Sequence, residues 1–142
     1  MYLDTAVLVK LLVREPDSDF YARTVEGQIV WSSQIVLTEC FSALLRKERE
    51  RQIGAPHRQR AWAQVERDVA EHRVNLITLT TEVLMRANGI LGVCHPTIAL
   101  RSLDAIHLAS AERSQSWPIC SNDGRMRLAA EQLGLPLGPL PS

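Results

Sequence analysis

Short apolar segments alternate along this chain with longer stretches of helical periodicity, and this alternation limits the folds that it can adopt. The segments typical of strands are residues 1–3, 29–31, 74–79 and 118–121, with a final short one near 135–137. Helical patterns lie between them, and the longest has its apolar positions between Val36 and Leu45, after a start signal at Ser32 and Ser33. Short apolar strands separated by helices predict an α/β fold whose central sheet is mostly parallel and covered on both faces.

The length of 142 residues predicts a single domain, which we place at residues 1–137, with a loose tail at 138–142 that is rich in proline. The formal net charge is zero, from 16 basic and 16 acidic residues. This balance excludes a protein that coats nucleic acid through bulk positive charge. It leaves open a local basic surface beside a local acidic site.

Three cysteines stand at positions 40, 94 and 120 without a CxxC pair, so we expect neither a disulfide framework nor a thiolate zinc site. Asp4 interrupts the apolar N-terminus, and no apolar run approaches the length needed to cross a membrane. We therefore expect a cytoplasmic protein without a membrane segment.

Four acidic residues occupy positions that suggest a shared site. Asp4 ends the first predicted strand and Asp123 follows the fourth, at the strand ends where parallel sheets bind ligands. Glu39 and Asp104 lie within apolar stretches, where an unpaired carboxylate is costly. Because no basic partner is evident beside them in sequence, their convergence predicts a divalent cation, with Mg²⁺ or Mn²⁺ favoured by oxygen ligands.

Each acid also has a simpler interpretation. Asp4 and Asp123 are good helix N-caps, and Asp104 is favourable at the positive end of its helix. Glu39 could face solvent at the edge of an apolar stripe. Only the set of four, taken together, favours a functional site.

Four segments resemble motifs of the PIN domain family. They are Tyr2-Leu3-Asp4-Thr5, Leu37-Thr38-Glu39-Cys40-Phe41, Leu100-Arg101-Ser102-Leu103-Asp104-Ala105-Ile106-His107-Leu108-Ala109, and Ser121-Asn122-Asp123. They occur in family order between residue 2 and about residue 137, and the third is the most specific. The size of the chain resembles that of VapC-type toxins of toxin–antitoxin pairs.

This resemblance implies a three-layer α/β/α sandwich, an Mg²⁺- or Mn²⁺-dependent endoribonuclease and a homodimer that a cognate antitoxin inhibits. Carried over by position, it assigns the acidic quartet to Asp4, Glu39, Asp104 and Asp123, with Asp4 and Asp104 as the main metal ligands. Thr5 and Ser121 match hydroxyl residues that would orient ligands or bound water. Some members carry a further acid after the fourth, where this chain has Gly124 and Arg125, which leaves the number of metal ions open.

With water as the nucleophile, an RNA phosphodiester would give products with 5′-phosphate and 3′-hydroxyl ends. The segment 46–60 carries six Lys or Arg against two Glu, and we expect Arg46, Lys47, Arg49 and Arg51 to contact RNA phosphates. A solvated helix flank explains the same charges. His107 is expected to lie in the core or to support a ligand, whereas the role of Arg101 stays open.

Other functions fit less well. A haloacid-dehalogenase-type phosphatase needs a second Asp two residues after the first, where this chain has Ala6. A dinucleotide-binding dehydrogenase needs GxGxxG after the first strand, which is absent. A non-toxin RNA-processing nuclease, or a PIN-like fold used as a non-catalytic interaction module, stays possible.

Overall fold

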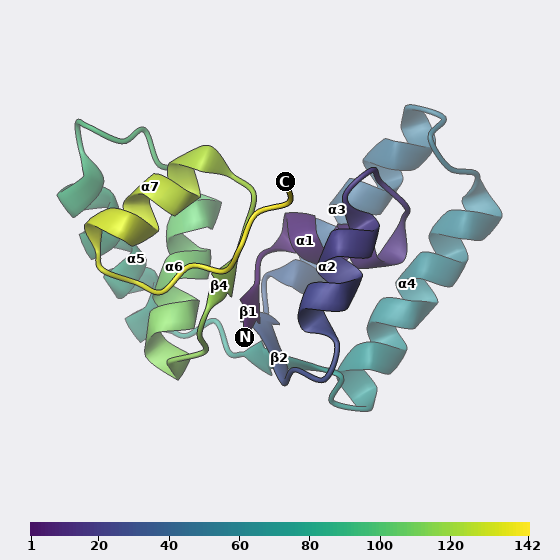
Figure 1. The fold of residues 1–142 in the computed structure, drawn as a ribbon, viewed down its shortest axis with the longest axis horizontal. Coiled ribbons are helices and arrows are strands. Elements are labelled where there is room, and N and C mark those ends of the chain that lie inside the picture. Colours follow the sequence, from purple (N-terminus) through teal and green to yellow (C-terminus); the bar gives the residue numbers. More distant parts are fainter.

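A four-stranded sheet divides the helices into two layers in the computed structural model, which describes all 142 residues (Figure 1). The strands are β1 (Tyr2–Leu3), β2 (Val30–Ser33), β3 (Val74–Ile77) and β4 (Ile119–Cys120). Their spatial order is β3-β2-β1-β4, and every pairing is parallel. The three-layer α/β/α fold with a parallel sheet is confirmed.

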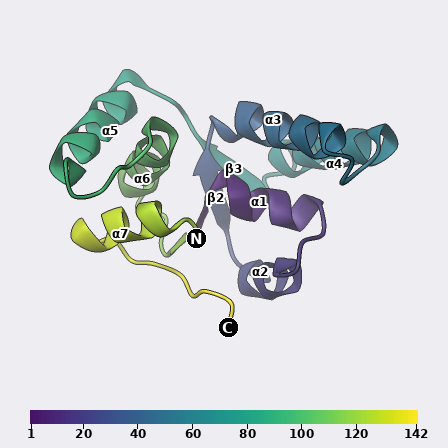
Figure 2. The same ribbon diagram turned by 90° about the horizontal axis from the view of Figure 1, so that it is seen from above.

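The helices occupy opposite faces of the sheet according to their place in the chain. They are α1 (Thr5–Leu12), α2 (Ser18–Val25), α3 (Val36–Arg49), α4 (Ala55–Ala70), α5 (Thr81–Cys94), α6 (Ser102–Ser114) and α7 (Gly124–Gln132). Helices α1 to α4 lie on one side, and α5 to α7 lie on the other (Figure 2). None of them combines the length and the apolar character that a membrane crossing requires.

Alternation along the strands separates two hydrophobic cores. Tyr2 and Ile119 belong to the larger core, which α5, α6 and α7 cover. Their neighbours Leu3 and Cys120 belong to the core under α1, α2 and α3. Successive strand side chains point to opposite faces, so even two-residue strands anchor both layers.

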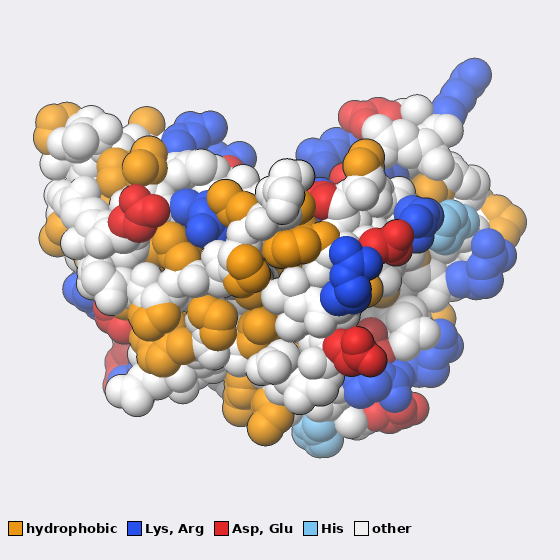
Figure 3. All heavy atoms as spheres, in the orientation of Figure 1, with side chains coloured by type: hydrophobic (Ala, Val, Ile, Leu, Met, Phe, Trp, Pro, Cys, Tyr) orange, Lys and Arg blue, Asp and Glu red, His pale blue; other side chains and the backbone are white.

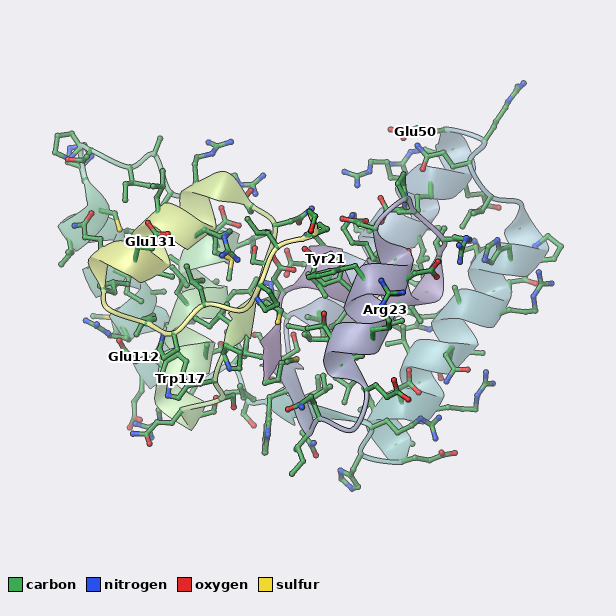
Figure 4. The ribbon with its side chains drawn as sticks, in the orientation of Figure 1. Tyr21, Arg23, Glu50, Glu112, Trp117 and Glu131 are labelled. Carbon is green, nitrogen blue, oxygen red and sulfur yellow. The ribbon has the colours of Figure 1, made fainter.

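A pair of hydrogen bonds also joins two helices of one outer layer. On the α5 to α7 side, the Arg86 guanidinium donates to both carboxylate oxygens of Glu112 at 2.6 and 2.9 Å, joining α5 to α6. Figure 4 shows Glu112 at the margin of this layer and Tyr21 extending from α2 toward the centre of the molecule. Tyr21 is fully buried, and its hydroxyl has no protein partner.

The predicted start of the long helix at Ser32 and Ser33 is wrong. Both residues belong to β2, and Ser33 pairs with Ile77 in the parallel ladder. The Ser32 hydroxyl donates to the carbonyl oxygen of Leu3 at 2.7 Å, so this serine joins two strands and caps no helix. The helix begins at Val36.

The third and the last predicted strands also differ from the prediction. Strand β3 ends at Ile77, two residues before the predicted end. The segment near 135–137 contributes a single parallel bridge, between Leu137 and Ile119. The amide of Gly138 also donates to the Ile119 carbonyl at 2.8 Å, so the first residue of the expected tail contacts β4.

Helix α3 buries a narrower stripe than its sequence pattern predicts. Val36, Cys40 and Leu44 are buried, whereas Phe41 is exposed and forms an edge-to-face contact with Trp62 on α4. The charged end of α3 is also not wholly solvated, because Lys47 is 8% exposed. Its ammonium lies 3.7 Å from Glu15 and donates to Gln52.

Candidate active site

The strand order places a crevice at the carboxyl end of β1. The chain passes from β1 to β2 on one side, and β4 later joins β1 on the other side. Such a reversal of strand order opens a gap beyond the strand ends, because the connecting helices diverge there. Asp4 follows β1, and Asp123 follows β4, so both acids stand at this gap.

All four predicted acids line one cleft of about 770 Å³, together with Thr5, Arg101 and His107. Helix α3 supplies Glu39 and helix α6 supplies Asp104. The space-filling view shows a hollow at the upper edge of the molecule, with acidic and basic side chains on its walls (Figure 3). The structure thus brings the four acids into one cleft, from four separate parts of the chain.

Asp4 is both a helix cap and a wall of the cleft. One of its carboxylate oxygens accepts the backbone N–H of Val7 at 2.9 Å, as the simpler interpretation predicts. The residue is only 5% exposed. Burial raises the pKa of Asp4, although hydrogen bonding from Ser121 and the nearby His107 oppose this rise. The cap therefore uses one oxygen and leaves the other without a backbone partner.

Glu39 is held by two side chains from other elements. Its Oε1 accepts the Thr5 hydroxyl at 2.7 Å and lies 2.7 Å from Nε2 of His107. Burial tends to raise the pKa of Glu39, but hydrogen bonds from His107 and Thr5 outweigh it, so that the pKa lies below its ordinary value. Glu39 therefore stays ionised in the cleft and does not lie free at a solvent-facing edge.

His107 links this cluster to the sheet. Its Nδ1 lies 2.7 Å from the Tyr2 hydroxyl, and burial holds the pKa of that hydroxyl well above its ordinary value. An ionised carboxylate can only accept, so Nε2 carries a proton that it donates to Glu39, and Nδ1 faces the Tyr2 hydroxyl. Both ring nitrogens are engaged, as expected for a residue that supports a ligand.

Asp104 and Asp123 share a basic partner that the sequence did not reveal. The Arg101 guanidinium donates to Asp104 at 2.9 and 3.3 Å and to Asp123 at 3.1 Å. The expectation that the acids lack a basic neighbour in sequence is therefore wrong. The i,i+3 spacing of Arg101 and Asp104 was the available signal, because side chains three residues apart meet on a helix surface.

Ser121 lies at the junction of two of the acids. Its hydroxyl oxygen accepts the backbone N–H of Asp123 at 3.1 Å, and the residue is almost fully buried. Hydrogen bonding from the same hydroxyl lowers the pKa of Asp4 and so opposes the rise that burial causes. Asp123 also caps α7, since its Oδ1 accepts the N–H of Met126 at 2.9 Å.

Three of the four predicted phosphate contacts lie at the cleft. Arg46, Lys47 and Arg49 line it, whereas Arg51 does not. Lys47 is already paired with Glu15 and Gln52, so it is less available than the two arginines. Lys10, which the sequence reading did not single out, also lines the cleft and pairs with Asp17 at 2.8 Å.

The donor set fits a hard divalent cation in its chemistry. All four acids offer carboxylate oxygens to one cleft, and neither a thiol nor a free imidazole nitrogen competes with them. No three acidic, His or Cys side chains are close enough in this arrangement to hold one ion together. The Arg101 guanidinium instead bridges Asp104 and Asp123.

Comparison with known sequences places the chain in a family. The PIN domain family model matches residues 1–132. Ribonuclease VapC46 of Mycobacterium tuberculosis is 38% identical over 141 residues, which cover 95% of this chain and 93% of that protein. Ribonuclease VapC35 of the same species is 31% identical with the same coverage.

Solved structures show the same fold at lower identity. The crystal structure of Mycobacterium tuberculosis VapC20, a Sarcin-Ricin loop cleaving toxin, has a TM-score of 0.69 at 20% identity and covers 90% of this chain and 93% of its own. VapBC2 of Rickettsia felis, bound to a promoter DNA fragment, has a TM-score of 0.67 at 15% identity and covers 96% of each chain. Sequence motifs, fold and relatives agree, and the chain belongs to the PIN domain family as a protein of the VapC type.

Proposed function

We propose that this protein is a metal-dependent endoribonuclease and the toxin of a toxin–antitoxin pair. The observation that carries the proposal is the convergence of Asp4, Glu39, Asp104 and Asp123 in one cleft. The ribonuclease names of the VapC relatives support RNA as the substrate. Arg101 supplies one positive charge to Asp104 and Asp123, and the negative charge that remains on the four carboxylates favours a bound Mg²⁺ or Mn²⁺.

Asp4 and Asp104 are the proposed main ligands, with Glu39 and Asp123 completing the site directly or through water. When bound, the ion would supply an acidified water and positive charge near the leaving oxygen. His107 and Thr5 hold the Glu39 carboxylate in direction, and Ser121 does the same for Asp4. Arg46 and Arg49 on the wall of the cleft would bind phosphates of the RNA backbone.

Hydrolysis by water, and not by the ribose 2′-hydroxyl, predicts products with 5′-phosphate and 3′-hydroxyl ends. End-group analysis of the cleaved RNA tests this step. A 2′,3′-cyclic phosphate product would overturn it, because that product requires attack by the ribose itself.

The biological setting is proposed from the relatives. The VapBC2 complex supports a cognate antitoxin as a partner. We propose that the protein acts in the cytoplasm as a homodimer that this antitoxin inhibits. Growth arrest on expression, relieved by co-expression of the antitoxin, tests the toxin role; cleavage without growth arrest would favour an RNA-processing nuclease.

The decisive assay for the enzymatic proposal is cleavage of structured RNAs with and without Mg²⁺ or Mn²⁺, beside the Asp4→Asn protein. We expect cleavage only by the wild type with metal. Equal cleavage by both proteins would reject the metal site. No cleavage of any RNA by a folded wild type that binds the metal would instead favour an interaction module.

A further inference from the structure

We propose that Arg101 neutralises the acidic cleft when no metal ion is bound. Its guanidinium and a divalent metal ion bind Asp104 and Asp123 in alternation. When metal binding releases the guanidinium, it contacts an RNA phosphate. This inference rests on the proposed function of the same site. Arg101 thus competes with the metal ion and, once displaced, contacts the substrate.

The hydrogen bonds of Arg101 support its competition with a metal ion. Its Nε and Nη2 donate to the two oxygens of Asp104, and Nη2 also reaches Asp123. Every hydrogen bond that the guanidinium makes goes to these two carboxylates. Asp104 is on α6, and Asp123 follows β4, so the guanidinium joins two separate elements across the cleft.

A guanidinium and a metal ion compete for these carboxylate oxygens of Asp104 and Asp123. Both are positively charged, and their repulsion at such short range is large. An arginine stays protonated in proteins, so it cannot avoid the repulsion by losing its proton. A cation that takes the oxygens that Arg101 now contacts therefore weakens the binding of the guanidinium and favours its displacement.

The position of Arg101 favours a second contact after displacement. The residue precedes the first turn of α6, and its side chain is 58% exposed, so it can move without disturbing the core. It lines the same cleft as Arg46 and Arg49, the proposed phosphate contacts. A free guanidinium matches a phosphate with two parallel hydrogen bonds.

The competition with the metal and the phosphate contact together predict that metal binding and RNA binding are coupled. Metal binding frees a phosphate contact, so RNA binds more tightly to the metal-loaded protein than the added charge of the ion explains. By linkage, RNA then strengthens metal binding by the same factor. The coupling depends on Arg101, before the first turn of α6, and not on Arg113 in its last turn.

Arg113 provides the matched control. It lies in the last turn of α6, whereas Arg101 precedes the first turn, and it has the same charge but pairs with Glu82 outside the cleft. Arg101→Gln and Arg113→Gln therefore remove the same charge from one helix at two different places. Arg101→Lys keeps the positive charge but loses the pair of hydrogen bonds that the guanidinium donates to Asp104.

The first experiment is calorimetric titration with Mn²⁺ and no RNA. Arg101→Gln should bind Mn²⁺ about fivefold more tightly than the wild type, since it removes a partly exposed competing charge. Arg113→Gln should match the wild type, and Arg101→Lys should fall between. Unchanged or weaker Mn²⁺ binding by Arg101→Gln would overturn this inference alone. Absence of Mn²⁺ binding by every protein would overturn the proposed metal site as well.

The second experiment measures binding of a 20-nucleotide RNA by fluorescence anisotropy, in EDTA and in Mn²⁺, with a gel to confirm intact RNA. The gain in affinity from Mn²⁺ should be larger for the wild type and Arg113→Gln than for Arg101→Gln. The salt dependence in Mn²⁺ should also be steeper for the wild type by about 0.7, the value for one phosphate contact on a single strand. Equal gains and equal slopes for all three proteins would reject the phosphate contact.

Discussion

The imidazole Nε2 of His107 lies 2.7 Å from the Glu39 carboxylate, and this contact joins the helix of one layer to an acid from the other. The other ring nitrogen lies 2.7 Å from the hydroxyl of Tyr2, which belongs to the inner strand β1. The direction of Glu39 is therefore set by residues on both faces of the sheet.

Replacing His107 should lower cleavage while leaving RNA binding intact. His107→Ala removes the partner that directs Glu39, and losing such a support costs about 10- to 100-fold in activity. Tyr2→Phe removes only the hydroxyl that orients the imidazole, so its loss should be smaller. Single-turnover cleavage rates and RNA affinities measure both effects. Full activity of a folded His107→Ala protein would show that Glu39 needs no such support.

The same contact predicts how stability depends on pH. The pKa of Glu39 lies below its ordinary value of 4.5, so its ionised form stabilises the folded state. This stabilisation is fully present above pH 4.5 and is lost as the pH falls through the lower folded pKa. Urea unfolding should show the stability of the wild type relative to Glu39→Gln decreasing as the pH falls below about 4.5. A constant difference over that range would contradict the prediction.

The stability that Asp4 contributes should depend on pH in the opposite direction, because burial raises the pKa of Asp4. Its contribution to stability is present below its ordinary value of 3.8 and is lost as the pH rises through the raised folded pKa. At neutral pH the ionised form of Asp4 is thus a cost in the absence of metal.

Asp4→Asn should therefore raise the Tm of the metal-free protein at pH 7, by about 2–4 °C. Asparagine caps a helix as well as aspartate does, whereas Asp4→Ala also loses the hydrogen bond to Val7 and should be about 1 kcal/mol less stable than Asp4→Asn. Both variants should be inactive. Equal destabilisation of the two would show that the charge of Asp4 is not a cost.

The basic residues that line the cleft should contribute to RNA binding, and basic residues outside it should not. Arg46→Gln and Arg49→Gln should each weaken RNA binding and lower its salt dependence by about 0.7, as expected for one phosphate contact. Arg51→Gln should change neither quantity, since Arg51 does not line the cleft. Filter binding at several salt concentrations measures these slopes. An effect of Arg51→Gln as large as the other two would place the RNA elsewhere.

The sequence predicted the layers of this fold and the convergence of its four acids because both depend on local signals. Apolar strands followed by polar residues indicate where a parallel sheet has its open edge, and Asp4 and Asp123 stand at that edge. The motifs around Glu39 and Asp104 then added the two acids that come from helices. Their presence in one cleft needed no knowledge of side-chain orientation.

The parts that the sequence missed depend on contacts between distant segments. Ser32 is typical of a helix start, but its hydroxyl bonds to Leu3 across the sheet. Lys47 lies in a charged run typical of a solvated flank, but Glu15 from another segment pairs with it and the fold buries it. The role of Arg101 depended on Asp123, 22 residues away, and only the folded chain brings them together.

The most direct test of the account is RNA cleavage as a function of Mn²⁺ concentration by the wild type and Asp104→Asn. The acidic cleft predicts no cleavage by the wild type in EDTA, restoration of cleavage as Mn²⁺ is added, and no cleavage by Asp104→Asn at any concentration that the wild type needs. Circular dichroism should show that both proteins are folded. Cleavage by the wild type in EDTA, or equal cleavage by Asp104→Asn, would contradict a metal-dependent nuclease site built on these carboxylates.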